Sequence, residues 1–334
     1  MKKNLAICGP YPPPFGGISV HIYRIEKLLI KYQIPYIIYD HYFSRKEHVV
    51  PTNKSPFWYL KFLFKNKHKV VHFHQFFKFH FIYYFLFSYF NRSQIIVTIH
   101  SERLLHYPKS IKKFFFFFLK HTRNLTLISV SKALTNELQA QKIQAIYLPA
   151  YVPPQPENPV KLNFNDDKIH FLFSVSRVTK ESSETLYDIP LIFEFLKQHK
   201  DKFHMTFMLN KTSSDLLYLN NLIEQYGLQK HIDLIYDRQL IDYLPNFAFL
   251  VRTNNSDGYG VSLQEAMDMG VPAIGSDTCM RPKGTILFKT GDLKDLTQKI
   301  ELVADSNPKD LLQEKEDLSF HLKLLDIYKK LLSK

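Results

Sequence analysis

Short apolar runs and longer amphipathic stretches alternate along almost the whole chain. Runs rich in Ile and Val are typical of strands, and stretches with apolar residues at every third or fourth position are typical of helices. Parallel strands are buried on both faces, which explains why the short runs are continuously apolar. Expected strands lie at 4–8, 36–39, 70–74, 95–99, 126–130, 144–148, 169–175, 205–209, 231–235, 247–251, 271–275 and 285–288. Expected helices include 18–32, 111–121, 187–198, 214–226, 261–269, 293–304 and the tail 309–334.

A proline-rich segment divides this pattern into two series. Residues 147–159, YLPAYVPPQPENP, contain five prolines and are typical of a linker. Strands that alternate with helices on both sides of it predict an α/β fold of two Rossmann-like, doubly wound domains that face each other across a cleft. The expected domains are 1–152 and 153–312, with a separate C-terminal helix at 313–334.

Charge and aromatic content separate the same two halves. The 334 residues carry a net charge of +13, but residues 1–150 hold 22 basic and 5 acidic side chains, whereas residues 151–334 hold 22 and 26. A hydrophobic content of 45% excludes a disordered chain. The two cysteines, Cys8 and Cys279, exclude a disulfide scaffold and a cysteine-based zinc site. No apolar stretch is long enough for a signal peptide or a spanning helix, so we expect a cytoplasmic protein.

The most informative segment is 252–277, RTNNSDGYGVSLQEAMDMGVPAIGSD. An expected strand ends in a polar loop, and Asp257, Gly258 and Gly260 then lead into a helix. Glycines let a ligand approach the backbone, and the free amides at a helix start favour phosphate. Ser262 adds a hydroxyl there, and Glu265 would lie about two turns inside the helix, where a carboxylate suits vicinal ribose hydroxyls. The alternative is an ordinary helix start with an N-cap Asp and a surface Glu.

This segment resembles the nucleotide-sugar motif of GT-B glycosyltransferases, particularly glycosyltransferase family four. That family has Glu-Gly-Phe-Gly, then Glu-Ala-Met and a Gly-x-Pro turn, which residues 270–272 match. The resemblance implies that the first acid, here Asp257 in place of Glu, contacts the donor sugar, and that Glu265 binds the nucleotide ribose. The amides near Gly260, Val261 and Ser262 would also hold the donor.

Two loops of the first half agree with this resemblance. The loop 10–17, PYPPPFGG, matches the family's Gly-Gly with Gly16 and Gly17, which would let the donor diphosphate and the acceptor approach the backbone; the alternative is a proline-stiffened turn. His100 ends an expected strand in VTIHS, which resembles a Thr-x-His motif on the acceptor side. His72 and His74 end the preceding strand, but no third ligand lies close in the sequence, so we favour a structural or acceptor-facing role over a metal.

Two cations follow the first strand of the second half. The family places an Arg and a Lys there to neutralise the donor diphosphate, and Arg177 and Lys180 occupy this place with a spacing that differs from the family's. Fixed cations at that point would stabilise the leaving nucleotide as its charge develops. The alternative for Lys180 is an ordinary exposed lysine.

The basic half also contains two aromatic segments, 76–90 and 110–120. Cationic aromatic helices lie in the interface of anionic membranes, and the alternative is a helix that covers a sheet with a wide buried face. The phenylalanine block 114–118 spans more than one helical face, so part of it should be exposed. The residues expected to face a membrane are Lys112, Lys113, Phe114, Phe115 and Phe118. Nucleic acid is disfavoured, because no nucleic-acid-binding motif accompanies the charge.

The sequence therefore predicts a glycosyltransferase that moves a sugar from a UDP- or GDP-linked donor to a saccharide or lipid-linked acceptor. By resemblance the reaction retains anomeric configuration and needs no metal or other cofactor, and the tail helix crosses back to the first domain. The enzyme would act in polysaccharide or glycoconjugate assembly, peripherally bound to the inner face of an anionic membrane. Two alternatives remain: a catalytically weakened GT-B subunit that scaffolds a partner enzyme, and a nucleotide-sugar epimerase.

Overall fold

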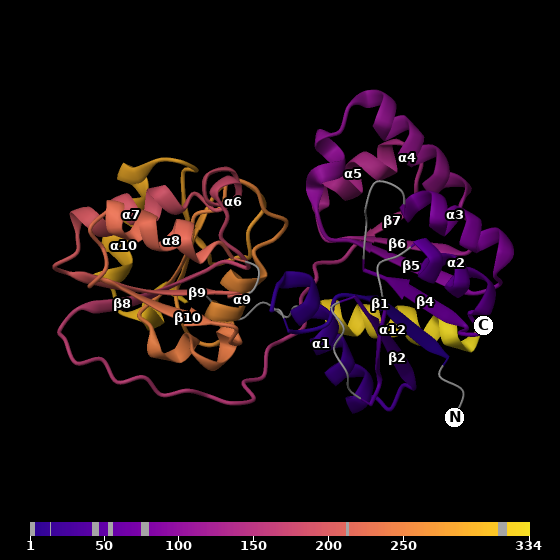
Figure 1. Cartoon of the computed structure of the whole chain (residues 1–334), viewed down its shortest axis with the longest axis horizontal. Helices are drawn as coiled ribbons and strands as arrows, with labels where there is room; N and C mark the ends of the chain where they lie inside the picture. Colours follow the sequence, from indigo (N-terminus) through magenta and orange to yellow (C-terminus); the bar gives the residue numbers. More distant parts are fainter. Residues whose placement is uncertain are drawn as a thin grey trace. The chain divides into compact units, whose positions relative to one another are not determined.

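The computed structural model describes residues 4–13, 15–41, 47–52, 56–74, 80–211, 214–312 and 319–334. The chain forms two compact units (Figure 1). Unit 1 comprises Met1–Pro13, Gly17–Val152 and Leu318–Lys334, and unit 2 comprises Pro14–Gly16 and Pro153–Asp317. The start of the aromatic segment 76–90 (residues 76–79) and the start of the expected tail domain (residues 313–318) lie outside the described residues.

Unit 1 is built on a sheet in which all the paired strands run parallel, in the order β3-β2-β1-β4-β5-β6-β7. Its strands are β1 (Leu5–Gly9), β2 (Tyr36–Asp40), β3 (Val49–Pro51), β4 (Val70–Phe73), β5 (Gln94–Ile99), β6 (Leu125–Ser129) and β7 (Ala145–Tyr147). Its helices are α1 (Gly17–Lys31), α2 (Pro56–Lys65), α3 (His80–Phe90), the 3-10 helix η1 (Glu102–His106), α4 (Lys109–His121), α5 (Lys132–Ala140) and α12 (Phe320–Ser333).

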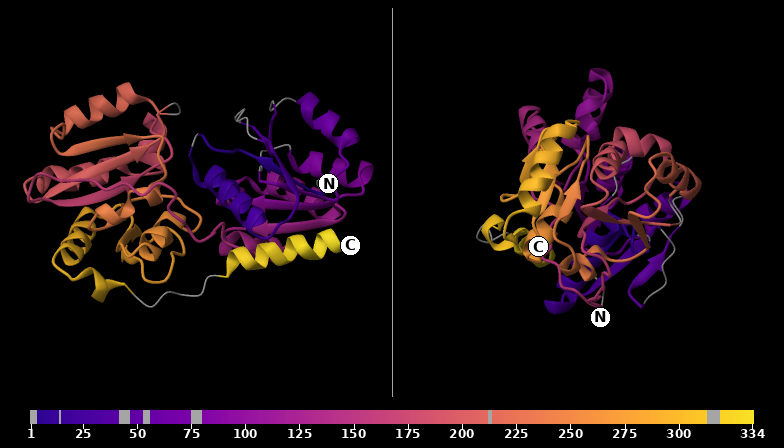
Figure 2. Two further views of the ribbon diagram at one scale, coloured as in Figure 1. Left: turned by 90° about the horizontal axis from the view of Figure 1, so that it is seen from below. Right: turned by 90° about the vertical axis from the view of Figure 1, so that its left-hand side faces the viewer.

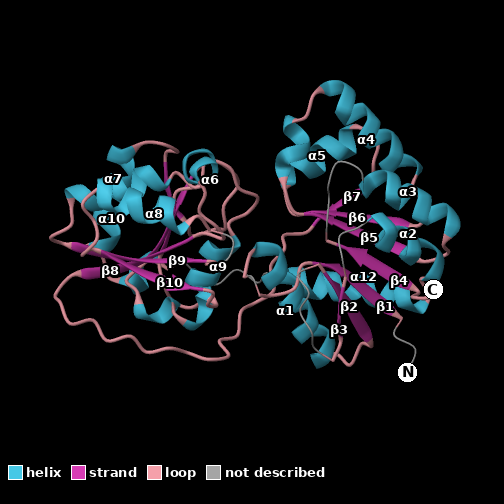
Figure 3. Ribbon diagram, viewed as in Figure 1, coloured by secondary structure: helices cyan, strands magenta, loops and turns pink. Residues whose placement is uncertain are grey.

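Helices cover both faces of this sheet (Figure 3). Along β1, Ala6 and Cys8 point into the core beneath α2, α3, α4 and α5, whereas Leu5 and Ile7 point into the core beneath α1 and α12. Figure 2 shows α12, in yellow, lying along unit 1. Because the strands are buried on both sides, polar groups can reach a ligand only from the loops at the sheet edges.

Unit 2 repeats the plan with a sheet of order β10-β9-β8-β11-β12-β13, again with all pairs parallel. Its strands are β8 (Ile169–Ser174), β9 (Phe203–Leu209), β10 (Ile232–Tyr236), β11 (Leu250–Arg252), β12 (Ala273–Ser276) and β13 (Ile286–Phe288). Its helices are α6 (Lys180–Thr185), α7 (Ile189–Gln198), α8 (Leu216–Gln225), the 3-10 helices η2 (Leu240–Asp242) and η3 (Leu244–Asn246), α9 (Val261–Asp268), α10 (Leu293–Ala304) and α11 (Pro308–Leu311).

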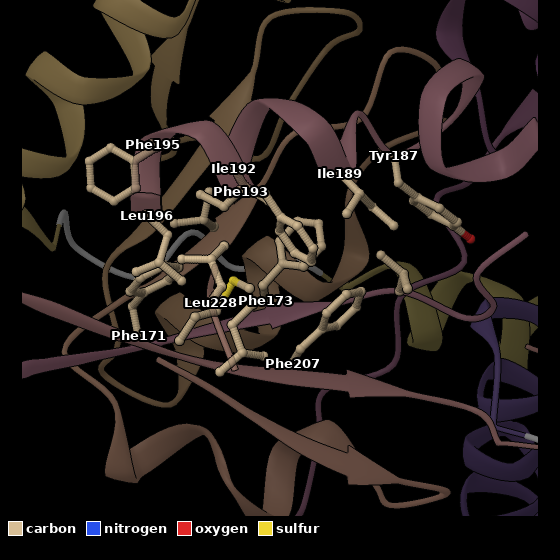
Figure 4. Packing of buried hydrophobic residues seen from close by; sticks show 14 of the residues in the cluster. Phe171, Phe173, Tyr187, Ile189, Ile192, Phe193, Phe195, Leu196, Phe207 and Leu228 are labelled. Carbon is tan, nitrogen blue, oxygen red and sulfur yellow. The ribbon is translucent and has the colours of Figure 1, made fainter. Parts of the chain in front are cut away.

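Aromatic side chains fill the larger core of unit 2. Figure 4 shows Phe193 of α7 lying over Phe173 and Phe207 of the sheet, and the Phe173 and Phe207 rings lie 5.0 Å apart. The opposite face of β8 carries Leu172, which packs with Leu263 of α9 in a smaller core. Close packing on both faces of the sheet holds β8 and β11 in place. It thereby positions the loops that follow these two strands.

The predicted doubly wound α/β architecture is confirmed, and the differences are local. The strand expected at 247–251 is confined to Leu250–Arg252, because η3 and the turn after it occupy the preceding residues. The sequence pattern missed β3, which is a three-residue edge strand ending in Pro51. It also missed α2, whose phenylalanines occupy both its buried and its exposed sides and hide the helical period.

Candidate functional site

The site of unit 2 lies where its strand order reverses. From β8 the sheet continues through β9 and β10 on one side and through β11, β12 and β13 on the other. Ligands of such sheets bind beyond the carboxyl ends of the strands at this switch point. The loop after β8 carries Arg177, and the loop after β11 carries Asp257, so the topology brings two predicted residues to one edge.

A glycine in the left-handed conformation starts α9. Gly260 has a φ of +79°, and a Cβ there would lie 2.8 Å from Arg281 Nη1 and 2.9 Å from Leu263 Cδ1. Both the backbone conformation and the lack of space require glycine. Gly260 is also the N-cap of α9, so the alternative in which Asp257 caps this helix is wrong.

Asp257 is held by two arginines. Arg252 Nε donates to Asp257 Oδ2 at 2.7 Å, and Arg281 Nη1 donates to the same oxygen at 2.5 Å. The backbone N–H of Gly258 donates to Oδ1 at 2.9 Å. Burial acts to raise the pKa of Asp257, but the two guanidiniums outweigh burial and hold this pKa well below its usual range. Asp257 is therefore an ionised carboxylate, and groups of the protein itself already donate most of the hydrogen bonds that its oxygens can accept.

Neither arginine is among the site residues that the sequence predicts. Arg252 lies at the end of β11, inside the segment that resembles the family motif, and its position at a strand terminus was an available signal. Arg281 lies in the loop after β12, where Nε donates to the Ser276 carbonyl at 2.8 Å and Nη2 donates to Ser276 Oγ at 2.9 Å. No spacing in the sequence marks Arg281, because only the folded loop brings it to Asp257.

Glu265 and Ser262 lie on the first part of α9. The Glu265 residue is 5% exposed, which contradicts the alternative of a surface Glu. The expected depth is also corrected: α9 begins at Val261, so Glu265 lies about one turn inside rather than two. Ser262 Oγ accepts a hydrogen bond from Arg252 Nη1 at 3.0 Å, and Val261 is half-buried.

Arg177 and Lys180 are both exposed. Arg177 lies in the loop after β8, and Lys180 is the first residue of α6. A capping box between Thr179 and Ser182 starts this helix, so that Lys180 is its first residue. Neither cation is built into the Arg252–Asp257–Arg281 cluster.

The predicted Gly-Gly pair lies at the start of α1, with Gly17 in unit 1. Gly17 is the first residue of α1, and a Cβ on it would meet nothing within 4 Å, so packing does not require this glycine. Gly16 is half-buried and belongs to unit 2. Packing instead requires Gly9 at the end of β1, where a Cβ would lie 2.5 Å from Ile22 Cδ1.

His100 belongs to a cluster of four histidines at the carboxyl ends of β4 and β5. His100 Nε2 lies 3.0 Å from His74 Nδ1, and the His74 and His72 ring centroids are 3.9 Å apart. His72 contacts Tyr328 of α12 and Thr98 of β5, so its role is structural. His21 of α1 completes the cluster, with its ring 5.6 Å from that of His100.

Burial keeps these histidines neutral. It lowers the pKa of His100 to about 4, and it holds the pKa of His21, His72 and His74 well below the usual range, with further lowering from neighbouring histidines. Among the described residues, no group of three or more His, Cys, Asp or Glu side chains has a geometry that could hold a metal ion. The cluster can therefore offer neutral imidazole donors and acceptors to a ligand.

The structure sorts the residues expected to face a membrane. Phe114 is half exposed and Lys113 is exposed. Phe115 is buried in the core with Phe81, which corrects its assignment. Phe118 is only partly exposed, and Lys112 is half-buried with its Nζ donating to the Leu105 carbonyl at 3.3 Å. The prediction that the phenylalanine block is split between core and surface is confirmed.

Comparisons with known proteins show which family unit 2 matches and which fold the two units share. Residues 155–316 match the family model for glycosyl transferases group 1. Unit 2 is a group 1 glycosyltransferase domain. The predicted enzyme class, a glycosyltransferase, is confirmed at this level.

Solved structures extend the similarity to both units. A glycosyltransferase from Rickettsia africae is 16% identical, with all of both chains covered and a TM-score of 0.70. Anabaena Alr3699/HepE, solved with UDP-glucose, is 10% identical, with 98% of this chain and 99% of that chain covered and a TM-score of 0.70. WaaG, a glycosyltransferase involved in lipopolysaccharide biosynthesis, is 12% identical. The match covers 97% of this chain and 99% of that chain, with a TM-score of 0.69. These likenesses confirm the GT-B fold. No curated protein matches the chain.

Replacing Gly260 tests the packing of this loop. Gly260→Ala should destabilise unit 2 by about 2–3 kcal/mol, because a strained φ adds to the clash with Arg281 and Leu263. Gly270→Ala is the matched control: it has the same φ of +79° with nothing within 4 Å, and should cost about 1 kcal/mol. Denaturant unfolding measures both, and equal losses would show that Arg281 does not crowd Gly260.

The histidine cluster predicts acid sensitivity. These groups have a lower pKa in the folded than in the unfolded state, so their contribution is complete above about pH 6.5 and falls as the pH drops toward 4. His100→Gln should flatten the loss of stability between pH 6.5 and 4.5 by up to about 1.4 kcal/mol per pH unit. His121→Gln, at an exposed site, should leave the wild-type profile unchanged. Parallel profiles for the His100 variant and wild type would contradict a lowered pKa of His100.

Proposed function

We propose that the protein transfers a sugar from a nucleotide-diphosphate donor to a saccharide or lipid-linked acceptor, as an enzyme of the family-four type. The observation that supports this most directly is the position of Glu265. It is buried one turn inside α9, beyond the carboxyl ends of the unit 2 strands, and follows the loop that contains Gly258 and Gly260. A buried carboxylate beside free helix amides suits a nucleotide with ribose hydroxyls and phosphates. Alr3699/HepE was solved with UDP-glucose, which favours UDP over GDP as the first donor to test.

The proposed reaction divides between the two units. Unit 2 holds the donor, with Glu265 on the ribose and the amides of Gly260, Val261 and Ser262 near the phosphates. Gly16 and Gly17, by the family resemblance, would let the diphosphate and the acceptor approach the backbone at the start of α1. His100, neutral at pH 7, offers a hydrogen bond to an acceptor or donor hydroxyl.

Bond making and breaking follow from the donor chemistry. The acceptor oxygen attacks the anomeric carbon as the bond from that carbon to the diphosphate oxygen breaks. In the retaining course that we propose, attack occurs on the face that the diphosphate leaves, and a phosphate oxygen takes the acceptor proton. The reaction then needs no metal and no covalent enzyme intermediate.

Glu265→Gln tests the donor site. The exchange keeps the shape but removes the charge, and losing a charge-assisted bidentate contact should weaken UDP binding by about tenfold or more. Glu224→Gln, on the exposed side of α8, is the matched control and should bind as wild type. Calorimetry with UDP, GDP, UDP-sugars and GDP-sugars measures the affinities. Unchanged affinities in a folded Glu265→Gln variant would contradict a role of Glu265 in donor binding.

Turnover separates this proposal from the two alternatives. Transfer from UDP-glucose or another nucleotide-sugar to an added acceptor by the isolated protein excludes a scaffold subunit. An epimerised nucleotide-sugar formed without any acceptor would instead establish the epimerase activity.

We further propose that unit 1 docks on an anionic membrane through an aromatic surface formed by α2, α3 and α4 (Figure 1). The side chains of this aromatic surface are large, apolar and at least 38% exposed: Phe57, Leu60, Phe64, Leu86, Tyr89, Phe90, Ile111, Phe114 and Phe117. Phe57 is 82% exposed and Phe64 64% exposed. No helix among the described residues is long and apolar enough to cross a membrane.

Ring contacts make this surface continuous. Phe64 of α2 lies 5.8 Å from Phe90 of α3, and Phe85 of α3 lies 5.3 Å from Phe118 of α4, between centroids. Exposed cations lie on or directly after the same three helices: Lys61, Lys65, Lys67, Arg92, Lys109, Lys113, Lys120 and Arg123. Glu102 is the only acidic residue in the sequence from 56 to 123, and it accepts a hydrogen bond from Ser131 Oγ. Apolar rings beside an uncompensated basic field suit anionic lipid and a cytoplasmic membrane face.

Liposome binding tests this surface. The triple variant Phe57→Ser, Phe64→Ser and Phe117→Ser should bind vesicles containing anionic phosphatidylglycerol at least tenfold more weakly, because three exposed rings lose their apolar contact. Leu217→Ser, at a 74% exposed site on α8, is the matched control and should bind as wild type. Wild-type binding should weaken with salt, and binding that ignores salt and lipid charge would contradict the proposal.

A further inference from the structure

The cluster around Asp257 holds more positive than negative charge. Arg252, Asp257 and Arg281 are joined by ion pairs of 2.7 and 2.5 Å, so two guanidiniums share one carboxylate and the three side chains carry a net +1. The Arg281 side chain is 1% exposed, the Asp257 side chain 14% and the Arg252 side chain 19%. An excess charge so far removed from water is costly unless an anion accompanies it.

Hydrogen-bond counting shows which member can bind that anion. Asp257 has about four acceptor positions, and Arg252, Arg281 and Gly258 already use three of them. Arg281 directs its Nε and Nη2 at Ser276, and its third bond goes to Asp257. Arg252 uses only two of its five N–H groups in bonds to described residues, one to Asp257 and one to Ser262 Oγ. Arg252 thus keeps donors and is the most exposed of the three.

The position of Arg252 also suits an anion. Its bond to Ser262 holds the guanidinium against the first turn of α9, where backbone amides are free of helical partners. Asp257 and Arg281 fix the plane of this guanidinium, so little side-chain entropy is lost when a ligand binds. Arg177 and Lys180 are exposed, and no ion pair with a described carboxylate fixes either of them as ion pairs fix Arg252 and Arg281 to Asp257.

We infer that Arg252 is an anion-binding residue of the donor site, positioned by Asp257 and Arg281, and that its ligand is an anionic oxygen group of the nucleotide-sugar. Two parts of a donor have this chemistry: the terminal phosphate of the nucleoside diphosphate, and a carboxylate on an acidic sugar. This inference rests on the proposed nucleotide-sugar donor.

The test compares ligands that differ by one anionic group. UDP, UMP, UDP-glucose and UDP-glucuronate are titrated by calorimetry into wild type, Arg252→Gln and Arg252→Lys. Arg252→Gln should weaken UDP at least tenfold and change UMP less than twofold, if the terminal phosphate is the ligand. A tenfold loss confined to UDP-glucuronate instead assigns the site to a sugar carboxylate. Arg252→Lys keeps the charge without the fork and should recover part of the affinity.

Two further variants separate binding from folding. Arg238→Gln, exposed on unit 2 after β10, is the matched control and should bind every ligand as wild type. Arg281→Gln removes the excess charge without touching Arg252. Arg281→Gln should therefore lower the affinity ratio of UDP to UMP, which a purely structural role would leave unchanged.

The outcomes distinguish this inference from the proposed function. If wild type binds UDP, UDP-glucose and UDP-glucuronate and Arg252→Gln binds them with the same affinities, the anion site alone is overturned. Wild type that binds none of these ligands, nor GDP or GDP-sugars, overturns the proposed function and the anion site with it.

Discussion

Burial of both faces of two all-parallel sheets is the constraint on which this structure depends. Strands such as β1 and β8 carry apolar side chains on each side, because helices cover both faces. Polar groups that can reach a ligand are thereby confined to the loops at the ends of the strands. In each unit, the reversal of strand order marks where such loops lie beyond the carboxyl ends of the strands. The loop after β11, which carries Asp257, and the histidines at the ends of β4 and β5 both lie where this constraint puts them.

The two edges handle buried polarity in opposite ways. At the unit 2 edge, Asp257 stays ionised because Arg252 and Arg281 compensate its burial. At the unit 1 edge, no carboxylate of a described residue pairs with His72, His74 or His100, and burial keeps His100 neutral with a pKa of about 4. Fixed charge suits a phosphorylated donor, whereas neutral imidazoles suit hydroxyl groups of a sugar acceptor, which agrees with the proposed division of roles.

The unusual phenylalanine content of unit 1 serves two purposes on the same helices. In α4, Phe115 lies in the core and Phe117 is 55% exposed, although they are two residues apart. Helical geometry requires this separation, because neighbouring positions in a helix point about 100° apart. Exposed rings of α2 and α3 extend the surface, so the two aromatic segments noted in the sequence form part of a surface shared by three adjacent helices.

Much of the fold followed from local pattern. Continuous apolar runs identified nearly all the strands, since parallel strands need apolar residues on both faces, and the proline-rich segment lies where unit 1 passes into unit 2. The glycines and acids of the segment 252–277 pointed to the glycosyltransferase family. The edge strand β3 and the helix α2 were missed, because neither has a clear period.

Only the tertiary structure decided which side chains act together. Arg281 lies 24 residues from Asp257 and in a different loop, and nothing local marks it as a partner. Burial likewise separated Phe115 from Phe114 and fixed the neutral state of the histidines, because both depend on neighbours distant in the chain. The sequence by itself determined the elements and the motif, which depend on local periodicity and spacing. The charge balance of the site and the exposed aromatic surface arise from packing between elements, which periodicity does not encode.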